Sequence, residues 1–344
     1  MTAPRRPLVL LATSTLAAIA AMAATFASGQ TAAPDPSFSS SGPLPNPPSL
    51  AGNGRVGVGG ESDGGKQRAA SIPDFSGVWA HPSWPSFEPP LSGPGPVRNR
   101  SRLRTGESNG NQLVGDYTNP ILKPPAAEVV KKHGEVSLAG VTYPTPANQC
   151  WPQPVPYIFW TIGIQLLQEP DRITILYSNP DHEVRHVRLN SSHPAHVTPS
   201  WYGDSVGHYE GDTLVIDTVG VKTGRPFAMV DIFGTPYTEA LHVVERYSLL
   251  DYETAKEAQE RGEKENRRLP FNDSGMDADP DYRGNGLQLE FTVEDEGVFT
   301  MPWSALMTYR RARGGWPEFV CAENIREYYA NKNSDVPTAD KPDF

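Results

Sequence analysis

The residue types that carry out acid–base chemistry are concentrated in one stretch of the chain. Residues 193–217 contain three histidines and four carboxylates. Histidine and carboxylate side chains exchange protons near neutral pH when burial or a neighbouring charge shifts their pKa values. Glu210 and Asp212 belong to a Glu-Gly-Asp sequence typical of a turn, so we predict a structural role for both. Asp217 lies within a predicted strand, where a carboxylate must be paired or face solvent.

A second charged segment, residues 242–246, lies in another predicted strand. Because side chains alternate between the two faces of a strand, His242 and Arg246 share one face, opposite Glu245. An inward-facing Arg246 would need a carboxylate such as Asp217, as a structural pair or as a clamp for an anion. We predict that the two segments together form any reaction site. The candidate catalytic residues are His193, His208, Asp217, His242 and Arg246.

Several common kinds of site have no signal in this sequence. His193 and His196 have a spacing seen in metal ligands, but Pro194 prevents the helical turn that would direct both at one ion. The chain has no HExxH motif, GxSxG elbow, phosphate-binding loop or dinucleotide fingerprint. We therefore expect neither a metal nor a cofactor. The formal net charge of −10 excludes nucleic acid as a partner, because nucleic-acid binding needs Lys and Arg to neutralise phosphates.

The seven tryptophans indicate a second kind of site. Most of them are expected in the core. Two or three at the mouth of a barrel would form a pocket for an apolar or aromatic small molecule. The candidate ligand-binding residues are Trp79, Trp201 and Trp303.

The elements that must position these residues are mostly strands. Period-two alternation is clearest at 287–293, which fits a strand with one buried and one wet face. A short helix is expected after Pro124, and 157–167 is a long apolar stretch counted with the β region. Further strands are expected at 74–79, 172–177, 184–189, 213–219, 241–249, 299–311 and 316–321. The pattern predicts an all-β fold, either an antiparallel β-barrel of the lipocalin or calycin type or a β-sandwich, with short peripheral helices.

The chain divides into three parts by composition, the last of which contains an insertion. Residues 1–27 have the positive, apolar and small-residue regions of a secretory signal peptide, with a membrane anchor as the alternative. Residues 28–71 are a linker rich in Pro, Gly and Ser, expected to be disordered. One β domain is expected over 72–335, and the charged stretch at 252–286 is interpreted as a surface insertion or a lid. The predicted location is the periplasm or the exterior of the cell, with no stable membrane insertion after cleavage.

The chain contains two cysteines, Cys150 and Cys321. An even number of cysteines in an exported protein favours a disulfide, which would close a loop of about 170 residues. Two buried thiols, or one reactive thiol, are the alternative.

Three sequence blocks together resemble a known family. They are Asp74–Trp79, Trp201–Thr218, and Pro302-Trp303 with Cys321–Asn324. The order DFSGVW, GDSxGxxEGDTLVxDT, PW and CxEN resembles a family of secreted bacterial proteins for which no reaction is agreed. The resemblance implies export and a β fold, and the insertion at 252–286 departs from it. Gly77-Val78-Trp79 is also similar to the G-x-W motif with which lipocalin-like barrels open, whose Trp closes one end.

Three functions stay open from the sequence. The first is an exported lipocalin-like protein that binds a small hydrophobic or aromatic molecule in a barrel pocket. The second is a cofactor-independent enzyme, a lyase, isomerase, hydratase or hydrolase, that uses histidine and carboxylate side chains in the same pocket. The third is a structural or interaction protein of the cell envelope without a pocket.

Overall fold

The computed structural model describes residues 72–81, 87–178, 183–224, 228–265, 276–314, 316 and 320–321, all within the compact unit 66–344. The predicted signal peptide and the predicted linker lie outside the described residues, as do 266–275 of the insertion and 322–324 of the last sequence block.

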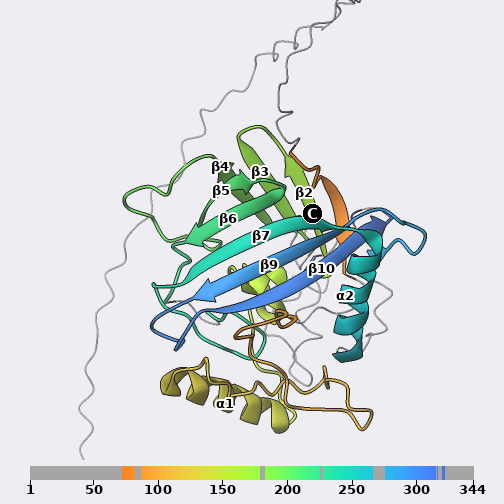
Figure 1. The fold of residues 1–344 in the computed structure, drawn as a ribbon. Helices are drawn as coiled ribbons and strands as arrows, with labels where there is room; N and C mark the ends of the chain where they lie inside the picture. The colour runs from red at the N-terminus through yellow and green to blue at the C-terminus, as the bar shows by residue number, and fades with distance from the viewer. Residues whose placement is uncertain are drawn as a thin grey trace, which may run out of the picture. The chain divides into compact units, whose positions relative to one another are not determined.

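Nine of the ten described strands close into a barrel (Figure 1), which confirms the all-β barrel fold. Their order around the barrel is β1-β2-β3-β4-β5-β6-β7-β9-β10, and β10 pairs with β1 to close it. The short strand β8 (Asp277–Ala278) pairs with the end of β10. The nine barrel strands are β1 (Gly77–Ala80), β2 (Gly163–Gln168), β3 (Arg172–Tyr177), β4 (Val184–Leu189), β5 (Asp204–Glu210), β6 (Thr213–Val219), β7 (His242–Leu250), β9 (Gly286–Glu294) and β10 (Trp303–Arg313).

The barrel is mixed rather than wholly antiparallel. Strands β4 and β5 run parallel, with Arg188 opposite Val206 and Leu189 opposite Gly207. The other eight neighbouring pairs are antiparallel. A parallel neighbour needs a crossover rather than a tight turn, and the segment 190–203 provides it. The sequence block around His193 is therefore a crossover that brings the chain back to the edge of β4.

Side-chain alternation separates the core from the outer face. On β9 the buried residues Leu287, Leu289, Phe291 and Val293 fill the interior, as the sequence pattern predicts. On β6 the fully buried Leu214 and Ile216 do the same. Every barrel strand thus has one face that packs inward and one that meets solvent or a covering segment.

The barrel has two ends of different character. We call the end that holds the β5–β6 turn, the end of β7 and the start of β9 the mouth, and the other end the base. At the base, aromatic side chains from irregular segments pack against the barrel wall. The rings of Phe87 and Phe159 meet Phe291 edge-on at 4.9 and 5.0 Å between centroids, and Phe299 meets Trp303 at 5.7 Å. These contacts close the base with packed side chains.

The helices lie outside the barrel wall. Helix α1 (Pro124–Leu138) begins with two prolines, as expected, and continues past Gly134. Helix α2 (Tyr252–Glu265) follows β7 and stands beside the mouth in Figure 1. Its first turn is anchored by Asp251, whose carboxylate accepts hydrogen bonds from the backbone N–H and the hydroxyl of Thr254.

Two sequence predictions about the elements are wrong. The apolar stretch 157–167, counted with the β region, is only partly strand, because residues Tyr157–Phe159 form the 3₁₀ turn η2 and β2 begins only at Gly163. A second 3₁₀ turn, η1, spans Ala147–Gln149. The predicted strand at 316–321 lies partly outside the described residues, and Trp316 and Val320 are in no strand.

A disulfide joins Cys150 and Cys321, with their Cα atoms 5.6 Å apart, which confirms the predicted bond. It connects the end of η1 to the residues that follow β10. Among the described residues, no helix has the length and apolarity required to cross a bilayer.

Candidate functional site

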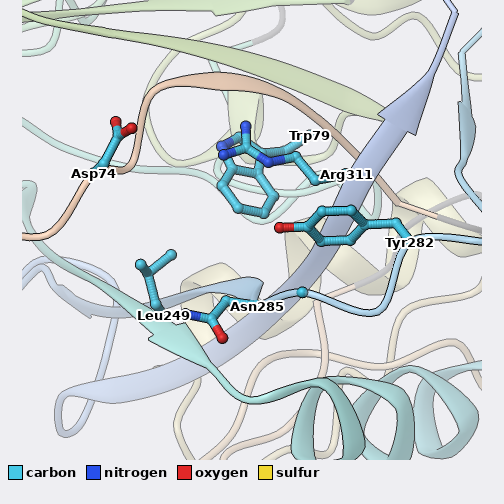
Figure 2. A pocket seen from close by; sticks show the side chains of 7 residues that line it. Asp74, Trp79, Leu249, Tyr282, Asn285 and Arg311 are labelled. Atoms are coloured by element: carbon cyan, nitrogen blue, oxygen red, sulfur yellow. The ribbon is translucent and has the colours of Figure 1, made fainter.

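A pocket of about 320 Å³ opens at the mouth of the barrel (Figure 2). Its lining comes from β1 and the segment before it, from the ends of β7 and β10, and from the segment before β9. In Figure 2 the Tyr282 ring reaches in from one side, and Leu249 lies across from Trp79 and Arg311. The lining residues are Asp74, Trp79, Leu249, Tyr282, Gly284, Asn285 and Arg311. A volume of this size is at the lower end of the range for small-molecule sites.

A cation–π stack forms one wall of the pocket. The guanidinium carbon of Arg311 lies 3.9 Å from the ring centroid of Trp79, and Arg311 Nη1 donates a 2.6 Å hydrogen bond to the carbonyl of Ser76. Gly77 makes this approach possible: its φ of 116° is in the range that glycine favours, and a Cβ there would lie 1.9 Å from Arg311 Nη1. The glycine of the G-x-W motif therefore leaves room for the guanidinium that covers the tryptophan.

The insertion provides the opposite wall. The backbone carbonyl of Tyr282 accepts a 2.7 Å hydrogen bond from Arg310 Nη2 of β10. The guanidinium groups of Arg283 and Arg310 lie 5.1 and 4.8 Å from the ring centroid of Tyr252, the first residue of α2. These contacts fix the described part of the insertion to the barrel, so that the Tyr282 side chain lines the pocket.

The barrel interior holds a buried ion pair. Arg185 of β4 and Glu245 of β7 face each other with Arg185 Nη2 to Glu245 Oε2 at 2.6 Å, and their side chains are 2% and 0% exposed. Burial opposes the charge on Arg185, but the carboxylate and two neighbouring tyrosines outweigh it, so the pKa of the guanidinium is raised. Glu245 also accepts a 3.1 Å hydrogen bond from the Tyr247 hydroxyl.

Three tyrosines surround this pair, and burial raises the pKa of each of them. For Tyr177 of β3, Arg185 opposes the shift, and Glu245 and Glu183 add to it. For Tyr309 of β10, Tyr177 and the carboxylates Glu88 and Glu245 add to it. The tyrosines, the arginine and the carboxylates therefore act on one another within a single cluster, which we call the interior cluster.

The mouth pocket and the interior cluster lie at successive depths along the same strands. On β7 the inward side chains descend from Leu249, which lines the pocket, to Tyr247 and then Glu245. On β10 they descend from Arg311 to Tyr309. One step of two residues spans about 6.5 Å along a strand. The cluster thus begins one side-chain layer beneath the pocket.

Three of the predicted catalytic residues come together, but on the outer face of the barrel near the base. His193 Nε2 and His242 Nε2 each lie 3.1 Å from Asp217 Oδ1, and His193 Nδ1 lies 2.7 Å from Asp204 Oδ2. Arg188 continues this chain of contacts through two hydrogen bonds to Asp204. Both contacts of His193 are hydrogen bonds only when each ring nitrogen carries a proton.

The charges of this outer chain shift the pKa values of its members. The hydrogen bond from His242 lowers the pKa of Asp217, and the bond from Arg188 lowers the pKa of Asp204, each against a smaller opposing effect of burial. Asp217 in turn raises the pKa of His242, and Glu294 contributes to this increase. The chain can move a proton along the outer surface, but the described pocket opens at the other end of the barrel.

The other two predicted catalytic residues form a separate exposed group. Glu210 Oε1 lies 3.1 Å from His208 Nε2, and Glu210 Oε2 accepts a 2.7 Å hydrogen bond from Arg246 Nη2. Arg246 is 43% exposed in its side chain, so the inward-facing arginine considered from the sequence is wrong. Its strand neighbour Glu245 has the inward position instead. The five residues therefore do not converge on one cavity.

The three predicted ligand-binding tryptophans lie in three different places. Trp79 lines the mouth pocket. Trp303 is 1% exposed and packs in the aromatic base of the barrel. Trp201 lies in the crossover, where its ring meets that of Trp151 edge-on at 5.6 Å and Lys222 Nζ lies 5.5 Å from its centroid.

The residues missed from the sequence are those of the interior cluster and the pocket wall. Arg185 lies in the segment VRHVRL, where it shares a phase with Val187 and Leu189, but the sequence pattern predicted only a strand there and no buried arginine. Its partner Glu245 was placed opposite His242, but nothing in the strand indicated which face is buried. Tyr282 lies in an insertion with no strand pattern. No group of three or more His, Cys, Asp or Glu side chains is arranged to hold a metal ion in the part of the chain that the structure describes.

Comparisons with protein-family models, with curated proteins and with solved structures find no match to this chain. The geometry of the barrel is therefore the basis for assigning a function.

Proposed function

We propose that this protein is a lipocalin-like binding protein that takes a small planar, largely apolar molecule into the pocket at the mouth of the barrel. The observation that supports the proposal is the pocket itself, with an aromatic wall at Trp79, a second aromatic side chain at Tyr282 and an aliphatic one at Leu249. These three side chains provide contacts for a planar ligand body, and because polar atoms make up most of the lining surface, the ligand must also carry polar groups. Asp74, Asn285 and Arg311 add polar groups that would orient it.

We also propose that binding takes place outside the cytoplasm, in the periplasm or beyond it. The Cys150–Cys321 disulfide supports an oxidising compartment, since such bonds are rare where thiols are kept reduced. Edman sequencing of protein recovered from the periplasm is expected to begin near Ser28. An intact Met1 on the recovered protein would contradict export with cleavage.

Ligand capture tests the binding function. Mass spectrometry of the exported protein after native purification is expected to detect a small planar molecule that denaturation releases. The variants Tyr282→Ala and Leu249→Ala remove two sides of the pocket and should each weaken calorimetric binding of that molecule by about tenfold. Leu167→Ala is the matched control, because Leu167 is exposed on the outer face of β2. Equal binding by all three variants would exclude the mouth pocket as the site.

A further inference from the structure

The interior cluster contains hydrogen-bond donors that nothing in the described protein satisfies. Arg185 Nε and Nη1 and the hydroxyl groups of Tyr177 and Tyr309 are buried and have no hydrogen-bond partner among the described residues. Each such group costs free energy when it is removed from water without a partner. Tyr247 differs, because its hydroxyl donates to Glu245.

The chemistry of these atoms defines what could bind to them. Arginine nitrogens only donate hydrogen bonds, so a group that meets Arg185 Nε and Nη1 must be an acceptor. Tyrosine hydroxyls can also donate to it. The Arg185 guanidinium carbon lies 5.9 Å from the centroid of the Tyr177 ring, so a ligand oxygen that meets Arg185 would also lie near Tyr177.

The local charge favours a neutral acceptor over an anion. The single guanidinium of Arg185 is already paired with Glu245. The carboxylates of Glu88 and Glu183 also act on the two tyrosines of the cluster. A further negative charge would meet these carboxylates in a medium of low dielectric constant, where like charges repel strongly.

We propose that Arg185, Tyr177 and Tyr309 form a deep subsite that binds a neutral hydrogen-bond acceptor of the ligand, such as the carbonyl oxygen of an aromatic ketone, ester or amide. The subsite begins beneath the mouth pocket with Tyr309, the next inward residue to Arg311 on β10, and Arg185 lies deeper, at the level of Glu245 on β7. The planar body of the ligand then occupies the pocket while its carbonyl group reaches the cluster. This inference rests on the proposed binding function and names the chemical class of the ligand.

Three probes of similar shape test the inference: 2-acetylnaphthalene with a neutral carbonyl, 2-ethylnaphthalene without an acceptor, and 2-naphthoate with a charge. Calorimetry on the full-length exported protein is expected to find 2-acetylnaphthalene bound about tenfold more tightly than either of the others, the gain from one or two hydrogen bonds. Equal affinity for the acetyl and ethyl compounds, or tighter binding of the carboxylate, would overturn the deep subsite and leave the binding function standing. Failure of all three probes to bind would contradict both proposals.

Conservative variants make the test independent of folding. Tyr177→Phe combined with Tyr309→Phe removes two buried hydroxyl groups, of which that of Tyr309 has no partner among the described residues and that of Tyr177 at most a weak contact with Tyr247, so the melting temperature should change little. The double variant should lose about tenfold in affinity for 2-acetylnaphthalene and keep its affinity for 2-ethylnaphthalene. Tyr237→Phe is the control, because Tyr237 is buried outside the pocket and the interior cluster, its hydroxyl donates to the carbonyl of Lys222, and the variant should keep the preference for the acetyl compound. An unchanged preference in the double variant would show that the hydroxyls meet only water, and the subsite would be rejected.

Discussion

Strand β4 carries two arginines in opposite surroundings. Arg185 points into the barrel, where its side chain is 2% exposed and pairs with Glu245. Arg188, three residues later, points outward with 46% of its side chain exposed and pairs with Asp204. Both ion pairs have a shortest nitrogen–oxygen distance of 2.6 Å. An arginine–carboxylate pair of the same length therefore occurs in the barrel interior, where the dielectric constant is low, and on the outer face, where water is present.

The same difference separates the two polar groups of the molecule. The outer chain from Arg188 to His242 satisfies its nitrogens and oxygens with one another and with solvent. The interior cluster is shielded from water and keeps donors that have no partner in the part of the chain that the structure describes. A buried donor without a hydrogen-bond partner destabilises the folded protein, and a ligand that accepts a hydrogen bond from it removes that penalty. An exposed donor gains less, because water already accepts its hydrogen bond. The comparison favours the interior, not the outer histidines, as the place of function.

The largest expected effect comes from the two arginines. Arg185→Met leaves Glu245 buried without its cation and should lower the free energy of unfolding by about 3–5 kcal/mol. Arg188→Met breaks an exposed pair and should cost less than about 1 kcal/mol. Urea denaturation of both variants measures the difference. Equal losses would contradict the contrast between the two faces of β4.

A buried histidine is expected to respond to acid. His133 of α1 is 2% exposed, stacks on Tyr143 with ring centroids 3.7 Å apart, and has no hydrogen-bond partner for either ring nitrogen among the described residues. Burial lowers the pKa of His133 to about 4 from 6.5, so the unfolded chain binds this proton first as the pH falls. Stability is therefore lost between about pH 6.5 and pH 4, by about 3 kcal/mol at 1.36 kcal/mol for each pH unit.

The variant His133→Leu isolates that contribution. Its stability should fall by about 3 kcal/mol less than that of the unaltered protein between pH 7 and pH 4, as followed by chemical denaturation. Parallel pH profiles for the two proteins would show that His133 takes up its proton without cost in the folded state.

A glycine at the mouth provides an intermediate effect. Gly77→Ala introduces a Cβ within 1.9 Å of Arg311 Nη1 at a positive φ, and we expect a loss of stability of about 1–3 kcal/mol together with weaker ligand binding. Gly106→Ala is the control, because its φ is also positive, at 90°, but its Cβ would meet no atom within 4 Å. Both variants strain the backbone, but only Gly77→Ala displaces Arg311, which lines the pocket. Only Gly77→Ala should therefore change ligand binding. Unaltered binding by Gly77→Ala would separate the Trp79–Arg311 stack from the site.

The smallest effect is expected on the outer chain. Asp217 raises the pKa of His242 in the folded protein. The interaction of the two side chains therefore stabilises the protein below pH 6.5, the pKa in the unfolded chain, and this contribution is lost as the pH rises through the pKa of the folded state. His242→Gln should remove less than about 1 kcal/mol at pH 6, because the pair is partly exposed, and almost nothing at pH 9. Ligand binding should not change. A large loss of binding in this variant would move the functional site to the outer face.

The barrel could be predicted from the sequence because polar and apolar residues alternate along some of its strands. The alternation at 287–293 marks two faces, and the structure has β9 there; β4 is also at the predicted place, 184–189. Strand β5 was missed, since Asp204–Glu210 contains glycine, histidine and acidic residues that read as turn chemistry. Its place next to β4 depends on a parallel crossover, which a local pattern does not encode.

The site was harder to predict, because period-two alternation does not say which phase is inside. On β7 one phase holds His242, Val244 and Arg246, and the other holds Val243, Glu245 and Tyr247, so each contains both apolar and charged residues. Only the packing of the other strands selects Glu245 for the interior. The grouping of His193, Asp217 and His242 was predicted, but not their position on the outside of the barrel.

Chemical-shift mapping tests the central claim most directly, that the barrel mouth and interior, rather than the outer histidines, bind the ligand. Titration of ¹⁵N-labelled protein with 2-acetylnaphthalene is expected to shift the Trp79 indole N–H and the backbone amides of Gly284 and Asn285, which line the pocket. The amides of Asp204 and Asp217 should stay unchanged. Shifts confined to Asp204, Asp217 and their neighbours, with none at the mouth, would contradict the account.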